Sequence, residues 1–116
     1  MPYDVLITGG RIVDGTGRDA FEGNVAIEAG RVVGVGDVGG QAKRMIDADG
    51  HVVAPGFIDA HTHYDAQLLW DASANPSTAH GITTILMGNC GYTLAPVRSD
   101  DQDYLIGLFA AAEEVP

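Results

Sequence analysis

The pattern of the sequence changes at Pro55-Gly56, and this change constrains the fold more than any other feature. Before it, short runs of β-branched and apolar residues alternate with glycine and aspartate, which is typical of strands joined by tight turns. After it, strand-like and helix-like segments alternate, which is typical of a parallel sheet with covering helices. We therefore expect a β-rich region at residues 1–55 and a mixed α/β region at residues 56–116.

The first region is predicted to form a small antiparallel sheet or one half of a β-sandwich. Gly9-Gly10 and Ala29-Gly30 each separate two strand-like runs, and a two-residue connection of this kind is typical of a tight hairpin. Further short strands are expected around Met45-Ile46 and at residues 51–53.

The second region is predicted to contain strand, helix, strand and helix in that order. Residues 57–63 are expected to form a strand and residues 65–70 a short helix. The continuous apolar run from Ile82 to Met87 is typical of a strand buried on both faces. A Ser-x-x-Gln capping box at residues 99–102 predicts the start of the last helix. Its apolar stripe consists of Tyr104, Leu105, Leu108, Phe109 and Ala112. Because two such units cannot close a barrel and no further strand follows, this region is expected to be truncated.

The chain is acidic, with a net charge of −10 from six Lys and Arg against sixteen Asp and Glu. It should repel phosphate backbones and anionic membranes, so neither nucleic acid nor membrane is expected as a partner. No apolar run approaches the ~20 residues of a membrane span, and the N-terminus does not resemble a secretory signal. Cys90 is the only cysteine, which excludes an intrachain disulfide. A cytoplasmic location is expected.

His61-Thr62-His63 is the first candidate for chemistry. Side chains two positions apart on a strand point to the same face, so both imidazoles could reach one point. Asp59 shares their parity, and it could either orient the ligands from behind or bind a metal itself. A His-x-His pair is a weak signal, since most such histidines have no special role. Its position at the end of a predicted strand favours a site, because α/β barrels place their sites there.

Cys90 follows the next predicted strand, within Gly88-Asn89-Cys90-Gly91. Neighbouring strands lie about 4.8 Å apart, and zinc binds sulfur at about 2.3 Å and imidazole nitrogen at about 2.0–2.1 Å. A thiolate at this position could therefore approach a metal held by the two histidines. The alternative is a small buried hydrophobic residue, as most free cysteines are. His80 is expected to cap the end of a helical or loop segment, and His51 to be structural or exposed.

The segment APGFIDAHTHYD, from Ala54 to Asp65, resembles the first-strand signature of the amidohydrolase superfamily. LITGGRIVDGTG and IDADGHVVAPG, which precede it, resemble that family's N-terminal β segment. HGITTILMGNCGYTLAPV, from His80 to Val97, is similar more specifically to the N-acyl-D-amino-acid deacylases, or D-aminoacylases, in which a cysteine after the second strand is characteristic. The resemblance covers nearly all of this chain but only the opening part of the family's length.

The resemblance implies an antiparallel β-sandwich part followed by the first two β/α units of an incomplete (β/α)8 (TIM) barrel. It places Cys90 at the family's zinc-binding cysteine, and His61 and His63 at a pair associated with a second, often weakly filled metal site. Asp59 would lie behind these ligands. The implied reaction is Zn²⁺-dependent hydrolysis of an N-acyl-D-amino acid, which releases a carboxylate and a D-amino acid.

The family's further histidine ligands, its catalytic aspartate and its groups for the substrate carboxylate have no counterpart here. No catalytic residue is therefore expected within this chain, which alone should be inactive and bind zinc weakly or not at all. One alternative is another amidohydrolase, such as a cyclic-amide hydrolase or a deaminase, although this gives no reason for Cys90. The other is a non-catalytic, self-associating β-rich module. The chain alone is expected to be a homo-oligomer, because residues 82–87 need to be covered.

Overall fold

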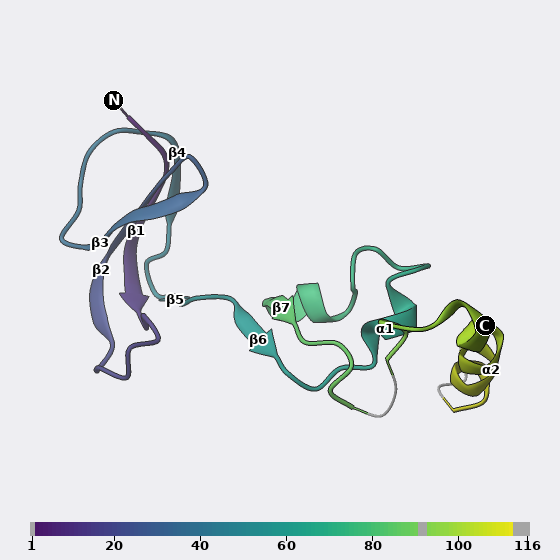
Figure 1. The fold of residues 1–116 in the computed structure, drawn as a ribbon. Helices are drawn as coiled ribbons and strands as arrows, with labels where there is room; N and C mark the ends of the chain where they lie inside the picture. Colours follow the sequence, from purple (N-terminus) through teal and green to yellow (C-terminus); the bar gives the residue numbers. More distant parts are fainter. Residues whose placement is uncertain (1, 91–92, 113–116) are drawn as a thin grey trace. The chain divides into compact units, whose positions relative to one another are not determined.

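The computed structural model describes residues 2–90 and 93–112, and the chain divides into two compact units, residues 1–55 and 56–116 (Figure 1). Within these residues, the first unit contains a five-stranded mixed sheet with β1 at its centre. β2 pairs with one edge of β1 in the antiparallel direction, whereas β4 and β5 pair with its other edge in the parallel direction. β3 extends the sheet beyond β2. The strands are β1 (Tyr3–Ile12), β2 (Phe21–Glu28), β3 (Arg31–Gly36), β4 (Ala42–Asp47) and β5 (Val52–Val53).

The prediction of an antiparallel sheet is therefore wrong for β4 and β5. The connection at residues 37–41 returns the chain from the end of β3 to the start of β1, where Ala42 pairs with Tyr3. The Asn24 side chain supports this crossing, because it donates to the Val38 carbonyl at 2.7 Å and accepts the Gly9 N–H at 2.9 Å. A crossing of this kind brings the next strand in parallel to β1.

The two predicted hairpins have different outcomes. At Ala29-Gly30 the hairpin is confirmed, since β2 and β3 meet there and both residues have positive φ, 49° and 73°. Positive φ at both central residues is the conformation of a type I′ turn. At Gly9-Gly10 the prediction is wrong, because β1 continues through both residues. The register with β2 shifts there, which marks a bulge, and Gly9 has a φ of 68°.

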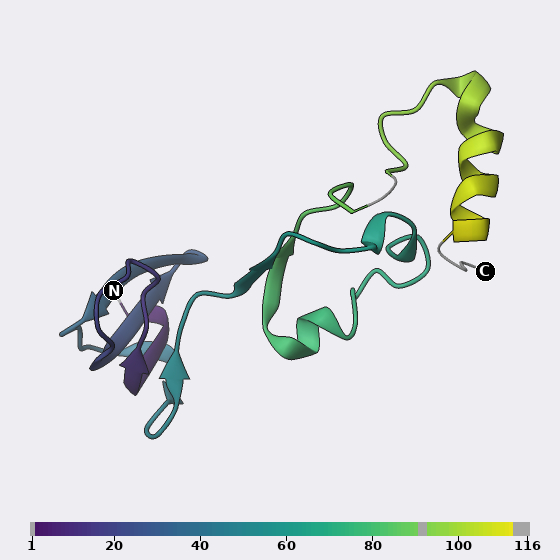
Figure 2. The same cartoon turned by 90° about the horizontal axis from the view of Figure 1, so that it is seen from below.

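The second unit contains the parallel strand pair β6 (Phe57–Asp59) and β7 (Ile82–Ile85), as predicted for a parallel arrangement (Figure 2). Both strands are shorter than predicted. Leu86 and Met87 follow β7 and are 52% and 45% exposed, so the prediction of a run buried on both faces is wrong for this chain. In the part that the structure describes, this sheet has only two strands, which cannot cover each other's faces. The helical segments are α1 (Tyr64–Gln67), η1 (Ser77–His80), η2 (Ser99–Asp101) and α2 (Gln102–Ala112).

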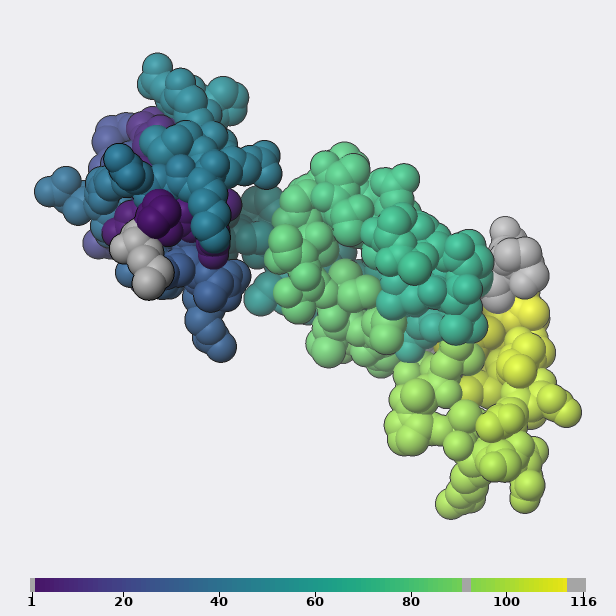
Figure 3. Space-filling view, turned by 90° about the horizontal axis from the view of Figure 1, so that it is seen from above, coloured from purple at the N-terminus to yellow at the C-terminus, as the bar shows by residue number. Residues whose placement is uncertain are grey.

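The segment between α1 and η1 folds back on α1. The Tyr64 hydroxyl lies 2.6 Å from Ser77 Oγ and donates to the Ala74 carbonyl at 3.3 Å. Gln67 Nε2 donates to the Asn75 carbonyl at 3.1 Å, and Asp71 accepts the backbone N–H of Asn75. The teal and green atoms of this segment form a continuous mass in the space-filling view (Figure 3). The second unit thus has a local polar framework beside its strand pair.

The last helix begins close to the predicted position but not through the predicted capping box. Arg98 precedes the 3-10 turn η2, and no side chain caps this turn among the described residues. Of the predicted apolar stripe, Phe109 is buried and Leu108 half-buried, whereas Tyr104 is 73% exposed. Among the described residues there is no helix with the length and apolar character that a membrane crossing needs.

Gly10 is expected to tolerate no side chain. A Cβ there would lie 2.5 Å from Val53 Cγ2 and 3.2 Å from Ala48 Cβ. Gly10→Ala should therefore lower the free energy of unfolding by about 1–3 kcal/mol, the range for overpacking. Gly39→Ala is the control, because no atom lies within 4 Å of its Cβ position. Thermal or urea unfolding measures both, and equal stability of the two variants would contradict the tight approach of β1 and β5.

Asp4 is expected to make stability depend on pH. Its carboxylate accepts hydrogen bonds from Lys43 Nζ at 2.6 Å and from the Ala29 N–H at 2.7 Å, and these bonds hold its pKa below the ordinary 3.8. A carboxyl group with a lowered pKa stabilises the fold above its ordinary pKa, and this contribution is lost as pH falls through the lowered value. Asp4→Ala should therefore unfold at a lower temperature than the unaltered chain at pH 7. The difference should shrink as pH falls below 3.8, and a difference that stays constant would contradict this role.

Candidate metal centre

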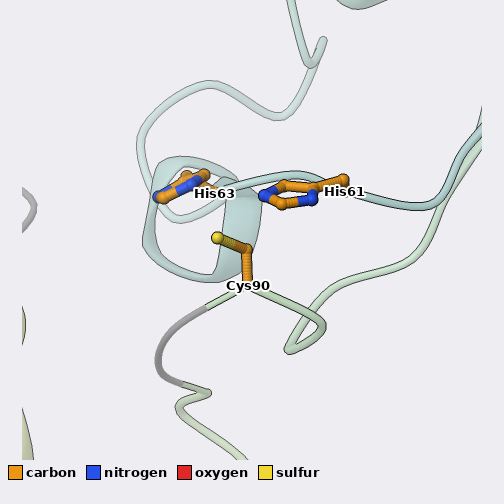
Figure 4. A group of neighbouring side chains, drawn as sticks. All are labelled: His61, His63 and Cys90. Atoms are coloured by element: carbon orange, nitrogen blue, oxygen red, sulfur yellow. The ribbon is translucent and has the colours of Figure 1, made fainter.

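The structure brings His61, His63 and Cys90 together, with their ligand atoms within 4.8 Å of one another (Figure 4). The two imidazole rings are stacked, with centroids 6.2 Å apart and planes inclined by 27°. The sulfur of Cys90 points toward the space between the rings (Figure 4). Both histidines are exposed and the cysteine is half-buried. The three predicted ligands therefore share one locus, which is open to solvent.

The histidines reach this locus from a loop rather than from a strand. β6 ends at Asp59, so the predicted strand over residues 57–63 is wrong beyond that residue. The side chains still alternate, because Thr62 is buried and donates to the Leu86 carbonyl at 3.1 Å while His61 and His63 face solvent. His63 lies immediately before α1, at the N-cap position. The expected convergence thus arises from a loop that is anchored by Thr62.

Asp59 contacts the backbone of the segment that carries the two histidines, residues 60–65, called the histidine loop. Its Oδ1 accepts the His61 N–H at 3.1 Å, and its own carbonyl accepts the Leu86 N–H at 2.8 Å. It also lines a shallow cavity of about 120 Å³ beside the ligands, together with His61, Thr62, His63, Tyr64 and Gln67. Asp59 therefore holds the loop in place; its predicted role toward a bound metal stays a prediction.

Sequence reasoning missed two polar residues that connect the histidine loop with the segment that carries Cys90, residues 86–90, called the cysteine loop. Asn89 Nδ2 donates to the Ala60 carbonyl at 2.5 Å, and Asp65 Oδ2 accepts the Gly88 N–H at 2.9 Å. Both residues lie inside the two motifs quoted above, within four positions of a predicted ligand. The only sequence signal for their role was that each lies close to a predicted ligand in the chain. That signal does not identify the backbone group with which each side chain forms its hydrogen bond. Gly91, the second glycine of the cysteine motif, lies outside the described residues.

The remaining histidines lie elsewhere, as expected. His80 is the last residue of η1, and Gly81 follows it with a φ of 79°, which is typical of a helix end. His51 is exposed, and its Nδ1 lies 2.9 Å from the Asp49 carbonyl oxygen.

Two imidazole nitrogens and a thiolate form a donor set that fits zinc, which binds histidine and cysteine in tetrahedral sites. Closed structural zinc sites have four protein ligands, whereas catalytic sites have three and keep one position open. The described residues bring three such ligands together, and the exposed histidines leave the locus accessible. The donor set and its exposure are thus compatible with a catalytic type of zinc site.

Comparison with known proteins places these motifs in a family. The N-acyl-D-aspartate deacylase of Alcaligenes xylosoxydans xylosoxydans is 44% identical over 95 residues, which cover 81% of this chain and 19% of that protein. A D-aminoacylase structure, from work on its binuclear metal center, is 42% identical with a TM-score of 0.78. The match covers 83% of this chain and 20% of the D-aminoacylase chain. The structure of the N-acyl-D-glutamate deacylase of Bordetella bronchiseptica, in complex with zinc and a phosphonate inhibitor, is 40% identical with a TM-score of 0.77. The match covers 84% of this chain and 21% of the deacylase chain.

This chain therefore spans about a fifth of the length of these relatives. The model of the Amidohydrolase family matches residues 44–111. This range includes the three candidate ligands, His61, His63 and Cys90, and both strands of the second unit. Since this match covers more than half of the sequence, the chain belongs to the Amidohydrolase family.

Proposed function

We propose that this chain is the N-terminal part of a metal-dependent hydrolase that releases a D-amino acid from an N-acyl-D-amino acid. The observation that carries the proposal is the convergence of His61, His63 and Cys90. A histidine pair alone would suit several amidohydrolases, but only a deacylase of the D-aminoacylase type gives a reason for the cysteine. The similarity to relatives named as deacylases of N-acyl-D-aspartate and N-acyl-D-glutamate supports the same substrate class.

Residues 1–55 would form a β-sandwich segment and residues 56–116 the first two β/α units of a (β/α)8 barrel. The parallel pairing of β6 and β7 supports the barrel assignment, because adjacent barrel strands are parallel. An apolar hollow of about 380 Å³ on the first unit supports the sandwich assignment. Its lining includes Ile7 of β1, Val25 of β2, Val32 of β3 and Val53 of β5. A second layer of apolar side chains would fill such a hollow.

Zinc would be held by His61, His63 and Cys90, with Asp59 keeping the histidine loop in place. A bound zinc ion polarises an amide carbonyl and lowers the pKa of water toward ~7. The chain's own part is to present two imidazole nitrogens and one sulfur on a solvent-accessible locus. Further ligands, the catalytic acid–base group and the groups that bind the substrate carboxylate would come from sequence outside these residues.

By itself, the 116-residue chain would self-associate in the cytoplasm. Phe57 and Ile58 of β6 are 65% and 72% exposed, and Leu86 after β7 is also exposed. Exposed apolar strand residues favour pairing with another copy.

Removal of the cysteine is expected to change metal binding in a recognisable way. Co²⁺ bound by a thiolate gives a sulfur-to-metal charge-transfer band, so Cys90→Ser should abolish this band in Co²⁺ titrations of the chain. His61→Ala should weaken binding, while His51→Ala, at an exposed histidine outside the site, should leave it unchanged. The same weak binding by the unaltered chain and by Cys90→Ser, with no thiolate band in either, would contradict the ligand role of Cys90.

The complete product of the gene that encodes this chain is expected to hydrolyse N-acetyl-D-methionine and to prefer it over the L enantiomer. Removal of the metal by a chelator should abolish turnover, and Zn²⁺ should restore it. The 116-residue chain should give no turnover, because it lacks the remaining catalytic groups. Clear turnover by the 116-residue chain would refute the statement that further catalytic groups lie outside it. Hydrolysis of only cyclic amides or aminopurines by the complete protein would refute the deacylase assignment.

A further inference from the structure

We propose that Asp65 and Asn89 are positioning residues, which hold Cys90 against the histidine pair. The inference rests on the proposed metal site and extends it to two residues that are not themselves ligands. The histidine loop (residues 60–65) includes the first two residues of α1, and the cysteine loop is residues 86–90.

Both residues bridge the two loops from a side chain to the backbone. Asn89 Nδ2 donates to the Ala60 carbonyl at 2.5 Å, across 29 residues of sequence. Asn89 directly precedes Cys90 and Ala60 directly precedes His61, so this bond connects the immediate neighbours of two ligands. Asp65 Oδ2 accepts the Gly88 N–H at 2.9 Å, across 23 residues. Both bonds run from a donor in the cysteine loop to an acceptor in the histidine loop, at Ala60 before the two histidines and at Asp65 after them.

Side chains are needed here because strand pairing has ended. The register of β6 with β7 ends at Asp59 and Ile85, and the Leu86 N–H to Asp59 carbonyl bond follows it. Thr62 adds one partly buried bond to the Leu86 carbonyl. Beyond Leu86, the bonds of Asp65 and Asn89 connect the cysteine loop to the histidine loop.

Gly88 shapes the cysteine loop so that its N–H reaches Asp65. Its φ is 73°, which a glycine adopts without the strain that a Cβ would bring. A Cβ at this position would also lie 3.0 Å from Thr93 Cβ. The positive φ of Gly88 therefore orients its N–H toward the Asp65 carboxylate, which accepts the hydrogen bond.

The two bonds are exposed to solvent, so each contributes little to stability. Their loss should leave the chain folded but release Cys90 from its position. Groups that orient metal ligands typically change metal affinity about 10- to 100-fold when they are mutated. The expected signature is thus a lost geometry and a weakened metal site in a folded chain.

The test uses the 116-residue chain without metal, studied by NMR. In the unaltered chain, nuclear Overhauser cross-peaks should connect the β protons of Cys90 with ring protons of His61 or His63. Asp65→Ala and Asn89→Ala should lose these cross-peaks. Asp65→Asn should keep them, because an amide oxygen still accepts the Gly88 N–H. Asp100→Ala is the control for the loss of one negative charge, since Asp100 is exposed in η2.

Co²⁺ titration gives the second readout. Affinity should fall at least about 10-fold in Asp65→Ala and Asn89→Ala and stay within about twofold in Asp65→Asn and the control. Thermal unfolding checks that each variant is folded. If both alanine variants fail to fold, the two bonds are structural and the proposal is overturned.

The proposal is also overturned if the unaltered chain shows no cross-peaks, or if both alanine variants keep them. Equal behaviour of Asp65→Asn and Asp65→Ala would overturn the role of the hydrogen bond, because only the charge would then matter. These outcomes are independent of the proposed activity. A complete protein that hydrolyses no N-acyl-D-amino acid would leave the cross-peaks and their loss unchanged.

Discussion

The parallel pairing of β6 with β7 is the constraint on which the candidate metal centre depends. In a parallel pair the carboxyl ends of both strands lie at the same edge, so the loops that follow them are neighbours. Asp59 lies opposite Ile85, and the Leu86 N–H extends the pairing by one bond. Residues 29 positions apart in the sequence, such as His61 and Cys90, can then lie within reach of one ion. An antiparallel pair would place the two loops at opposite ends of the strands.

The first unit is organised by a different constraint, the length of β1. A ten-residue strand has room for β2 along one edge and for both β4 and β5 along the other. Gly10 allows this packing, because a Cβ there would collide with Val53 of β5. Glycine is required here by a close approach between segments that are distant in sequence. The same residue is expected to form a turn when only its neighbours in the chain are considered.

This difference explains how much of the structure could be predicted from the sequence. Gly9-Gly10 and Ala29-Gly30 carry similar local signals, yet only the second becomes a turn. The outcome depends on whether the flanking segments pair with each other, and that is a non-local property. The ligand types and their convergence could be predicted, since they follow from side-chain chemistry and from the parallel order of the strands. The loop that delivers the histidines could not, because the bonds of Thr62 and Asn89 that shape it have partners 24 and 29 residues away.

Because β6 and β7 are exposed, the affinity of the metal centre should depend on what covers these two strands. Phe57 and Ile58, which precede the histidine loop, are 65% and 72% exposed, so few apolar contacts hold β6 in place. Where ligands are not already fixed, part of the free energy of metal binding is spent on ordering them. Packing that covers β6 and β7 removes this cost, and by linkage a bound metal stabilises that packing to the same extent. Weak binding by the chain alone and tighter binding where the strands are covered are therefore both expected from one coupling between the coverage of the strands and the position of Cys90.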